Sequence, residues 1–217
     1  MNLKVLIIEL TGGMLTSMAI FTLTLLFSLP LGLLVALGRM SKNKLVSLFF
    51  KVYISILRGT PLILQLMVVY FGPFFILGIQ MPRNYRFTAV IIGFVLNYAA
   101  YFAEIYRSGI ESIPIGQYEA AKVLGYSKYQ TFFRIILPQV IKRILPPVTN
   151  EAITLIKDTS LAFAISVQEM FTTAKAFASA QASVVPFIAA GVFYYVFNFL
   201  VERIMGWIEK KLSYYRI

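Results

Sequence analysis

Residues 119–125 read Glu-Ala-Ala-Lys-Val-Leu-Gly, and residues 135–138 read Ile-Ile-Leu-Pro. This stretch lies in the longest polar interruption of a chain whose other long segments are apolar. Gly125 can adopt the left-handed backbone conformation that ends a helix and turns the chain. Pro138 lacks an amide hydrogen and is tolerated best in the first turn of a helix. A short helix that ends at a glycine suits docking onto another protein better than crossing lipid.

The composition places the rest of the chain in a membrane. Hydrophobic residues make up 59% of the 217 residues, charged residues only 13%, and the mean hydropathy is +0.79. An average soluble domain is about one quarter charged. The chain has no cysteine and no histidine. A disulfide framework and a thiolate metal site are therefore excluded, the commonest proton shuttle is missing, and we expect no metal site.

Five segments are long and apolar enough to cross a bilayer, which takes about twenty residues. They are residues 13–37, 54–77, 87–110, 138–164 and 184–207. We therefore expect an all-α integral membrane protein with a single transmembrane domain over residues 1–217. The opening motif falls in the polar loop 111–137, and residues 166–183 are expected to form a second loop. The uncharged run 10–38 is longer than the apolar part of a signal peptide, so we expect it to stay in the bilayer.

The positions of lysine and arginine predict the orientation, because cytoplasmic loops are enriched in both. With five spans and the N-terminus outside, fourteen basic residues fall on the C-terminal side of the membrane and four on the other. The fourteen are Arg39, Lys42, Lys44, Lys51, Arg107, Lys122, Lys128, Arg134, Lys142, Arg143, Arg203, Lys210, Lys211 and Arg216. The four are Lys4, Arg83, Arg86 and Lys175. The net charge of +11 is thus interpreted as a topology signal rather than a nucleic-acid footprint, and loop 111–137 as cytoplasmic.

This loop is expected to hold two helices. Pro114 can open the first, since its missing N–H falls among the unpaired donors of a first helical turn. Glu119 lies near the positive end of that helix, where a carboxylate is favourable. The second helix, over 128–136, would lead into the fourth span. On residue chemistry alone, an interfacial amphipathic helix that merely anchors the loop is the alternative to docking.

The loop resembles the EAA loop, E-A-A-x3-G followed by I-x-L-P, of the transmembrane subunits of ATP-binding-cassette importers. In that family the loop forms a coupling helix that sits in a groove of the ATPase subunit. The resemblance implies that the coupling residues are Tyr118, Glu119, Ala120, Ala121 and Gly125. The chain has no G-x-x-x-x-G-K-[ST] phosphate loop, so we do not expect it to be an enzyme. ATP and Mg²⁺ are expected in a separate ATPase, and no cofactor is expected in this chain.

Two further stretches narrow the resemblance. Residues 57–62 read Leu-Arg-Gly-Thr-Pro-Leu, and residues 155–162 read Leu-Ile-Lys-Asp-Thr-Ser-Leu-Ala. Both are similar to segments of polar amino acid permeases, the small five-span branch of these importers, and the likeness covers about residues 10–210. It implies the type I importer fold in the cytoplasmic membrane of a prokaryote. It also implies ATPase subunits, a second copy of the chain or a related permease, and an extracytoplasmic substrate-binding protein as partners.

The fourth span carries polar side chains at membrane depth, where they usually line a cavity or pair inside the bundle. Pro146 and Pro147 remove two backbone donors there, which leaves carbonyls free to line a cavity. The polar residues fall within an arc of roughly 120° at 100° per residue, and they are Asn150, Glu151, Thr154, Lys157 and Asp158. The third span adds Asn97, Tyr101 and Glu104. These eight residues are the predicted substrate contacts.

The alternatives for these residues are structural. Lys157 could pair with Glu151 or Asp158 and merely neutralise buried charge. The polar residues of the third span could form hydrogen bonds between helices. Arg58 could pair with Glu104 or extend to the cytoplasmic surface.

The resemblance implies a polar amino acid as the substrate, and the charges of this polar face predict specifically a cationic one such as arginine, lysine or histidine. The fourth span offers two carboxylates against one lysine, and an unpaired acid in a water-poor cavity penalises neutral substrates. An ion-coupled secondary transporter or a channel subunit is the alternative, with Glu151 and Asp158 as ion sites. No nucleophile–base pair suggests a membrane-embedded enzyme.

Overall fold

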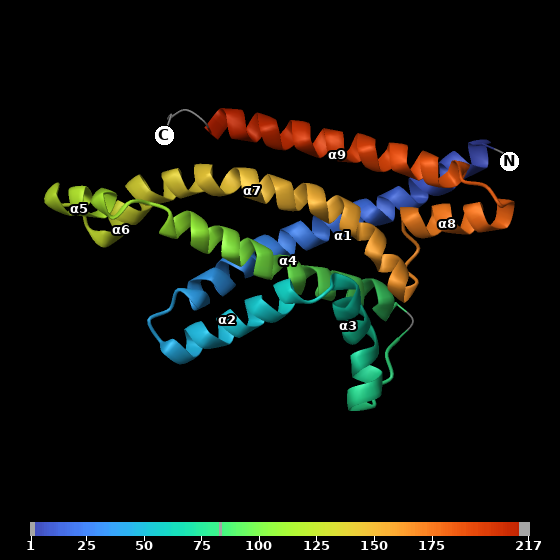
Figure 1. Ribbon diagram of the computed structural model, residues 1–217, viewed down its shortest axis with the longest axis horizontal. Helices are drawn as coiled ribbons and strands as arrows, with labels where there is room; N and C mark the ends of the chain where they lie inside the picture. The colour runs from blue at the N-terminus through green and yellow to red at the C-terminus, as the bar shows by residue number, and fades with distance from the viewer. Residues whose placement is uncertain (1–2, 83, 213–217) are drawn as a thin grey trace.

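The computed structural model describes residues 3–82 and 84–212, and Arg83 and Arg216 of the topology prediction lie outside them. The described residues form helices and no strand, as expected for an all-α protein (Figure 1). The helices are α1 (Leu3–Arg39), α2 (Lys44–Gly59), α3 (Leu62–Leu77), α4 (Tyr85–Glu111), α5 (Ile115–Val123), α6 (Lys128–Gln130), α7 (Leu137–Asp158), α8 (Met170–Gln181) and α9 (Val185–Leu212). A π-helical segment, Thr131–Ile136, precedes α7, and a 3₁₀ segment, Thr159–Ile165, follows it.

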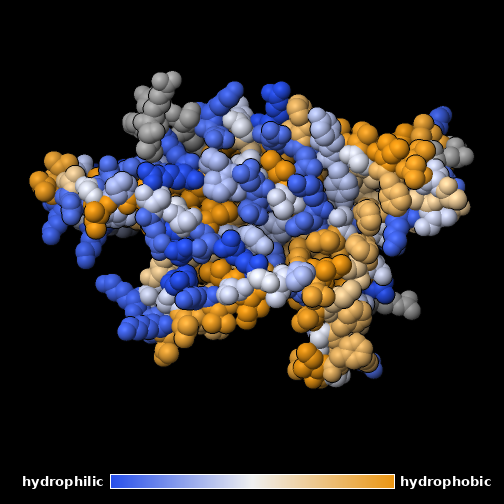
Figure 2. All heavy atoms as spheres, in the orientation of Figure 1, coloured by the Kyte–Doolittle hydropathy of each residue, from blue (hydrophilic) through white to orange (hydrophobic). Residues whose placement is uncertain are grey.

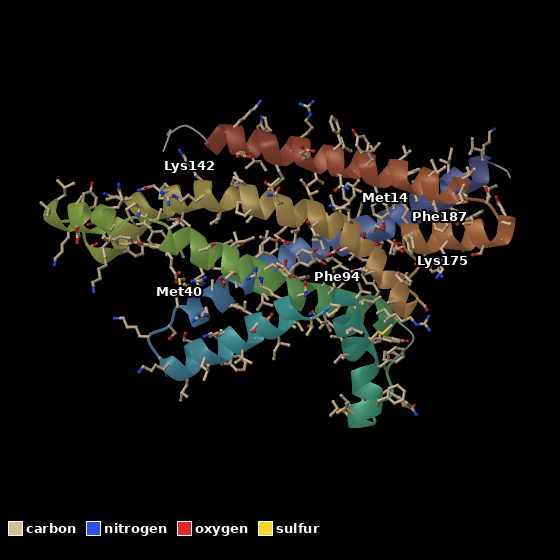
Figure 3. All side chains as sticks on the ribbon, viewed as in Figure 1. Met14, Met40, Phe94, Lys142, Lys175 and Phe187 are labelled. Atoms are coloured by element: carbon tan, nitrogen blue, oxygen red, sulfur yellow. The ribbon has the colours of Figure 1, made fainter. Side chains whose placement is uncertain are left out.

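Four helices, α1, α4, α7 and α9, run along the long axis of the molecule, with α5 and α6 at one end (Figure 1). Lys142 lies towards that end and Lys175 towards the other (Figure 3). Small residues let α1 approach α4 closely, as is common between membrane helices. A Cβ atom at Gly32 of α1 would lie 2.8 Å from the Cβ of Phe102. Phe94, labelled in Figure 3, is fully buried in the largest apolar cluster.

Three described helices are long and apolar enough to cross a bilayer: α1, α4 and α9. The pair α2 and α3 makes a fourth crossing if the two helices count as one bent span. α7 has 22 residues and is about 33 Å long at 1.5 Å per residue. Its composition is not that of an apolar span, because it carries Lys142, Arg143, Glu151, Lys157 and Asp158. The number of five spans therefore stays a prediction.

The second predicted span, 54–77, is bent in the structure. It consists of the end of α2 and the whole of α3, which meet at 110°. Pro61 disfavours the helical conformation in the residue before it, and Thr60 is extended, with φ −123° and ψ 147°. The Nε2 group of Gln65 donates to the carbonyls of Leu57 at 2.9 Å and of Thr60 at 3.0 Å. The carbonyls freed at the end of α2 thus remain satisfied.

The stretch 166–183, which the sequence predicted to be a loop, contains helix α8. Its first turn is capped by Glu169, whose carboxylate accepts hydrogen bonds from the backbone N–H of Phe171 at 2.8 Å and of Thr172 at 2.7 Å. An acidic N-cap satisfies two donors that the first turn leaves unpaired. The signal was present in the sequence, since alanines follow this residue in positions that favour a helix.

Candidate functional site

The polar arc of α7 is divided between two environments. Ala152, Leu155 and Ile156 are buried and fix the helix against its neighbours. Glu151 and Asp158 lie beside this buried strip and are half-buried. Asn150, Thr154 and Lys157 are exposed on the surface of the single chain. The five predicted residues therefore share one side of α7, but only the two carboxylates turn towards the bundle.

Asp158 is held by a residue that the sequence analysis did not name. The hydroxyl of Tyr98 donates a hydrogen bond of 2.8 Å to Oδ2 of Asp158, and Tyr98 is only 2% exposed. The bond joins α4 to the last turn of α7. The sequence analysis named Asn97 and Tyr101 on the same helix but not Tyr98. The spacing of apolar residues along a helix predicts that a tyrosine is buried, but it does not predict whether the hydroxyl bonds a carboxylate.

Arg58 lies next to the carboxylates. Its guanidinium carbon is 5.2 Å from the ring centre of Tyr101, within the range of a cation–π contact. Its charge attracts Glu151. No salt bridge within the described residues joins Lys157 to Glu151 or Asp158, although the charge of Lys157 attracts the neighbouring Asp158. The structure therefore brings Arg58, Tyr101, Glu151 and Asp158 together from three helices.

Asn97 and Glu104 are engaged in contacts between and within helices. The Nδ2 group of Asn97 donates to the carbonyl of Leu57 at 3.0 Å and to Oε1 of Gln65 at 2.9 Å. Asn97 is 4% exposed, and these bonds support the bend between α2 and α3. This is the interhelical alternative that the sequence left open.

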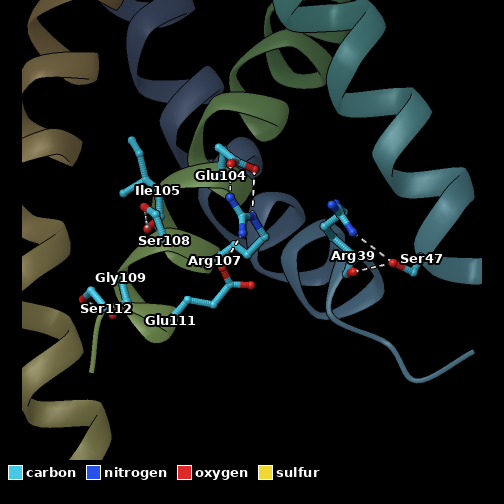
Figure 4. A network of polar contacts seen from close by, with 9 residues as sticks. All are labelled: Arg39, Ser47, Glu104, Ile105, Arg107, Ser108, Gly109, Glu111 and Ser112. Carbon is cyan, nitrogen blue, oxygen red and sulfur yellow. Dashed lines mark hydrogen bonds and ion pairs between the residues drawn. The ribbon is translucent and has the colours of Figure 1, made fainter. Parts of the chain in front are cut away.

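Glu104 belongs to an ion-pair network near the C-terminal end of α4 (Figure 4). Arg107 forms salt bridges with Glu104 and with Glu111, three and four residues away along the helix. Across from it, Arg39 at the end of α1 bonds to the hydroxyl of Ser47 in α2 at 3.0 Å. Glu104 therefore pairs with Arg107 rather than with Arg58. Its carboxylate lies with this network and away from Asp158.

The predicted helix in the polar loop is present as α5, which starts directly after Pro114. Gly125 has φ +78°, the left-handed conformation expected of a helix-ending glycine. The N–H of Tyr126 closes the turn by donating to the carbonyl of Ala121 at 3.0 Å. The second predicted helix is α6 with the π-helical segment. The wide π turn fits Pro138, which cannot donate to the carbonyl four residues earlier and would clash with it.

The exposed surface of α5 is apolar at its tip. Val123 is 87% exposed and Leu124 is 73% exposed, while Tyr118, Glu119 and Ala120 are also accessible. Ala121 differs from the prediction. It is 1% exposed because it packs against other residues of the chain, so in the single chain its side chain is not accessible to another protein.

The loop is tied to both neighbouring long helices. The Nη1 group of Arg143 in α7 donates to the carbonyl of Ser112 at 2.5 Å and to its hydroxyl at 2.9 Å, at the end of α4. Gln139 of α7 bonds to Gln117 of α5 at 3.4 Å. A Cβ atom at Gly109 would lie 2.2 Å from Cγ2 of Ile144. The polar loop is therefore in contact with α7, and α7 with the end of α4.

The helical bundle and the exposed loop match a known family. Residues 28–214 match the model of the binding-protein-dependent transport system inner membrane component. The chain belongs to this family. It is 38% identical over 209 residues to the L-cystine transport system permease protein TcyB of Bacillus subtilis (strain 168), covering 95% of this chain and 87% of the relative. It is 36% identical to a putative glutamine transport system permease protein GlnP of Rickettsia bellii (strain RML369-C), covering 95% and 94%.

A solved structure agrees with these relatives. The chain superposes with a TM-score of 0.85, at 30% identity and over 94% of each chain, on a protein described as an amino acid ABC transporter with histidines. An inward-facing methionine ABC transporter shares the fold, with a TM-score of 0.71 at 17% identity over 96% of each chain.

Membership of this family decides the broad function. The chain is the transmembrane permease subunit of an ATP-binding-cassette importer for polar amino acids, with the type I importer fold. It is a multi-pass membrane protein and a transport component, and the ATPase is a separate subunit. The alternatives of an ion-coupled transporter and of a membrane-embedded enzyme are thereby set aside.

Proposed function

We propose that the exposed polar side of α7 lines the pathway of the amino acid. The observation that carries the proposal is the row of Asn150, Thr154 and Lys157, which is exposed on the single chain in a segment that the proposed topology places at membrane depth. Charged and amide groups are costly against lipid and therefore face water or protein. Hydrophilic atoms also gather over the centre of the face seen in Figure 2. This face suits contact with a second permease subunit, either a copy of this chain or a relative.

The proposed topology has five spans, with the N-terminus outside and the C-terminus inside. α7 is the fourth of these five spans, because its charged residues face the pathway and the second permease subunit rather than lipid. The α5 tip then lies in the cytoplasm, where the exposed Val123 and Leu124 would dock on the ATPase. A binding protein on the outside would deliver the amino acid. Closure of the ATPases would move α5 and, through its ties, α4 and α7.

We propose a cationic substrate. Glu151 is countered by the charge of Arg58. Asp158 accepts a hydrogen bond from the neutral hydroxyl of Tyr98 and forms no salt bridge with Lys157 within the described residues, so its carboxylate can receive a cationic side chain. Arg58 or Lys157 would receive the carboxylate of the amino acid. A similar solved transporter is described with histidines, which supports this choice.

A neutral polar amino acid is the second candidate, and one observation favours it. Arg58 belongs to the site, so the charges of Arg58 and Lys157 balance those of the two carboxylates. A site with no net charge suits a zwitterion with an uncharged side chain. The relatives named for cystine and glutamine transport agree with this reading.

The two candidates are separated by equilibrium binding of labelled arginine, glutamine and glutamate to the purified permease–ATPase complex, without the binding protein. A cationic substrate predicts that arginine binds best and that Asp158→Asn weakens its binding by about tenfold or more, as for loss of a charged hydrogen bond. Preference for glutamine, with binding unchanged in Asp158→Asn, would instead support the neutral candidate. Transport by this chain alone down an ion gradient would contradict the importer function itself.

A further inference from the structure

Glu169 is a buried carboxylate that the proposed pathway does not use. It is completely buried and caps α8 through the two backbone N–H groups described above. Two side chains from other helices also reach Oε2. The hydroxyl of Ser17 in α1 donates at 3.4 Å, and the hydroxyl of Tyr194 in α9 donates at 3.2 Å. The carboxylate therefore joins α1, α8 and α9 at one point.

This joint sits in a tightly packed region. A Cβ atom at Gly13 of α1 would lie 2.7 Å from the Cα of Met170, so the backbones of α1 and α8 are in direct contact. Phe21 of α1 and Phe197 of α9 pack edge to face, with ring centres 5.3 Å apart. Close packing of this kind does not deform continuously. The three helices thus form a firm block around Glu169.

The end of α7 packs against this block. Ile156 is fully buried in the same apolar cluster as Met170 of α8 and Phe197 of α9. The hydroxyl of Thr159, a fully buried residue that follows Asp158 directly in the chain, donates to the carbonyl of Ile156 at 2.7 Å. Because Asp158 itself bonds to Tyr98, the last turn of α7 connects the block of α1, α8 and α9 to α4.

We propose that Glu169 and Tyr194 are positioning residues for the substrate face of α7. They hold the junction between α7 and the 3₁₀ segment against the block of α1, α8 and α9. They thereby determine the positions of Lys157 and Asp158. This rests on the proposed function of α7 as the pathway lining. Neither residue touches the amino acid. Their effect on it passes through the packing of Ile156 and the last turn of α7.

The test uses substitutions that remove one polar group each. Tyr194→Phe removes a hydroxyl and keeps the buried ring, and its matched control is Tyr195→Phe, because Tyr195 is the neighbouring residue and is 71% exposed. Glu169→Gln removes the charge and places an amide donor against backbone donors, with the exposed Glu209→Gln as its control. Should Glu169→Gln fail to fold, Tyr194→Phe still tests the proposal.

Two measurements are made on the purified permease–ATPase complex: binding of labelled arginine, glutamine and cystine, and amide hydrogen exchange over residues 155–165. With Tyr194→Phe we expect binding of the preferred amino acid to weaken about fivefold, as for one lost hydrogen bond. We expect exchange over 155–165 to accelerate about tenfold, as for local opening. Neither control should change either quantity.

The outcomes separate the two proposals. Unchanged exchange in Tyr194→Phe overturns the positioning role, whatever the wild type binds. Faster exchange with unaltered binding also overturns it, since the network would then serve stability alone. A wild-type complex that binds none of the three amino acids contradicts the proposed pathway function, and the exchange result still decides whether the network holds α7.

Discussion

Replacing Gly125 by valine is expected to uncouple ATP hydrolysis from transport. The residue has φ +78°, and a Cβ atom built there would meet nothing within 4 Å. The substitution therefore creates no clash, and its whole effect is conformational. An L-residue with a side chain pays about 1–2 kcal/mol for the left-handed conformation. A difference of this size lowers the population of the native turn about five- to thirtyfold relative to competing conformations.

Two further variants make this prediction specific. Gly116→Val applies the same change inside α5, where the backbone is helical and space is open, so we expect no loss, because valine is a slightly better helix former than glycine. Gly125→Asn keeps a residue that tolerates positive φ and should restore most of the function.

The assay is amino acid uptake by proteoliposomes that contain the permease, the ATPase and the binding protein, with ATP hydrolysis measured in parallel. For Gly125→Val we expect uptake to fall about fivefold or more, in line with the population of the turn, while the complex still assembles. Normal uptake in this variant, or an equal loss in Gly116→Val, would refute the argument that the left-handed turn directs α5.

Three further predictions concern topology, coupling and packing. In this cysteine-free chain, a cysteine at Ser41 should be labelled only from the inside and one at Asn84 only from the outside, by a membrane-impermeant maleimide. The reverse pattern would overturn the orientation. Arg143→Ala should raise the number of ATP molecules hydrolysed per amino acid transported, because it frees α7 from the end of α4, and an unchanged ratio would remove this contact from the coupling path. Gly32→Val should destabilise the protein by about 1–3 kcal/mol through overpacking, seen as a lower melting temperature, whereas Gly191→Val, which faces open space, should leave it unchanged.

The parts that the sequence predicted well are governed by local rules. α5 begins after Pro114 and ends before Gly125 because a proline and a glycine act within one turn of their own position. Three of the predicted apolar spans overlap α1, α4 and α9, because a long run of apolar residues is itself a signal contained in one stretch of sequence. The helix in 166–183 was overlooked because the apolar signal there is weak, although the capping signal of Glu169 was present.

What escaped prediction depends on residues distant in sequence. The bend at Pro61 needed Gln65 and Asn97 to satisfy the broken end of α2, and only one of these lies nearby in the chain. The bond between Tyr98 and Asp158 spans sixty residues. The five polar residues of α7 share one side of the helix, as helical periodicity predicts. Their division into inward carboxylates and an exposed row follows from how α7 is turned against α4, which periodicity alone does not fix.

The charge carried by α7 has a consequence for how the protein is made. A lysine or aspartate at the centre of a single helix opposes its insertion into a bilayer by about 2.5–3.5 kcal/mol, and α7 holds both, beside a glutamate. It can settle in the membrane only against partners that cover these groups. α4 is synthesised before α7 and α9 after it. In the proposed topology, a chain truncated before α9 would leave the flank of α7 that packs on α9 open to lipid.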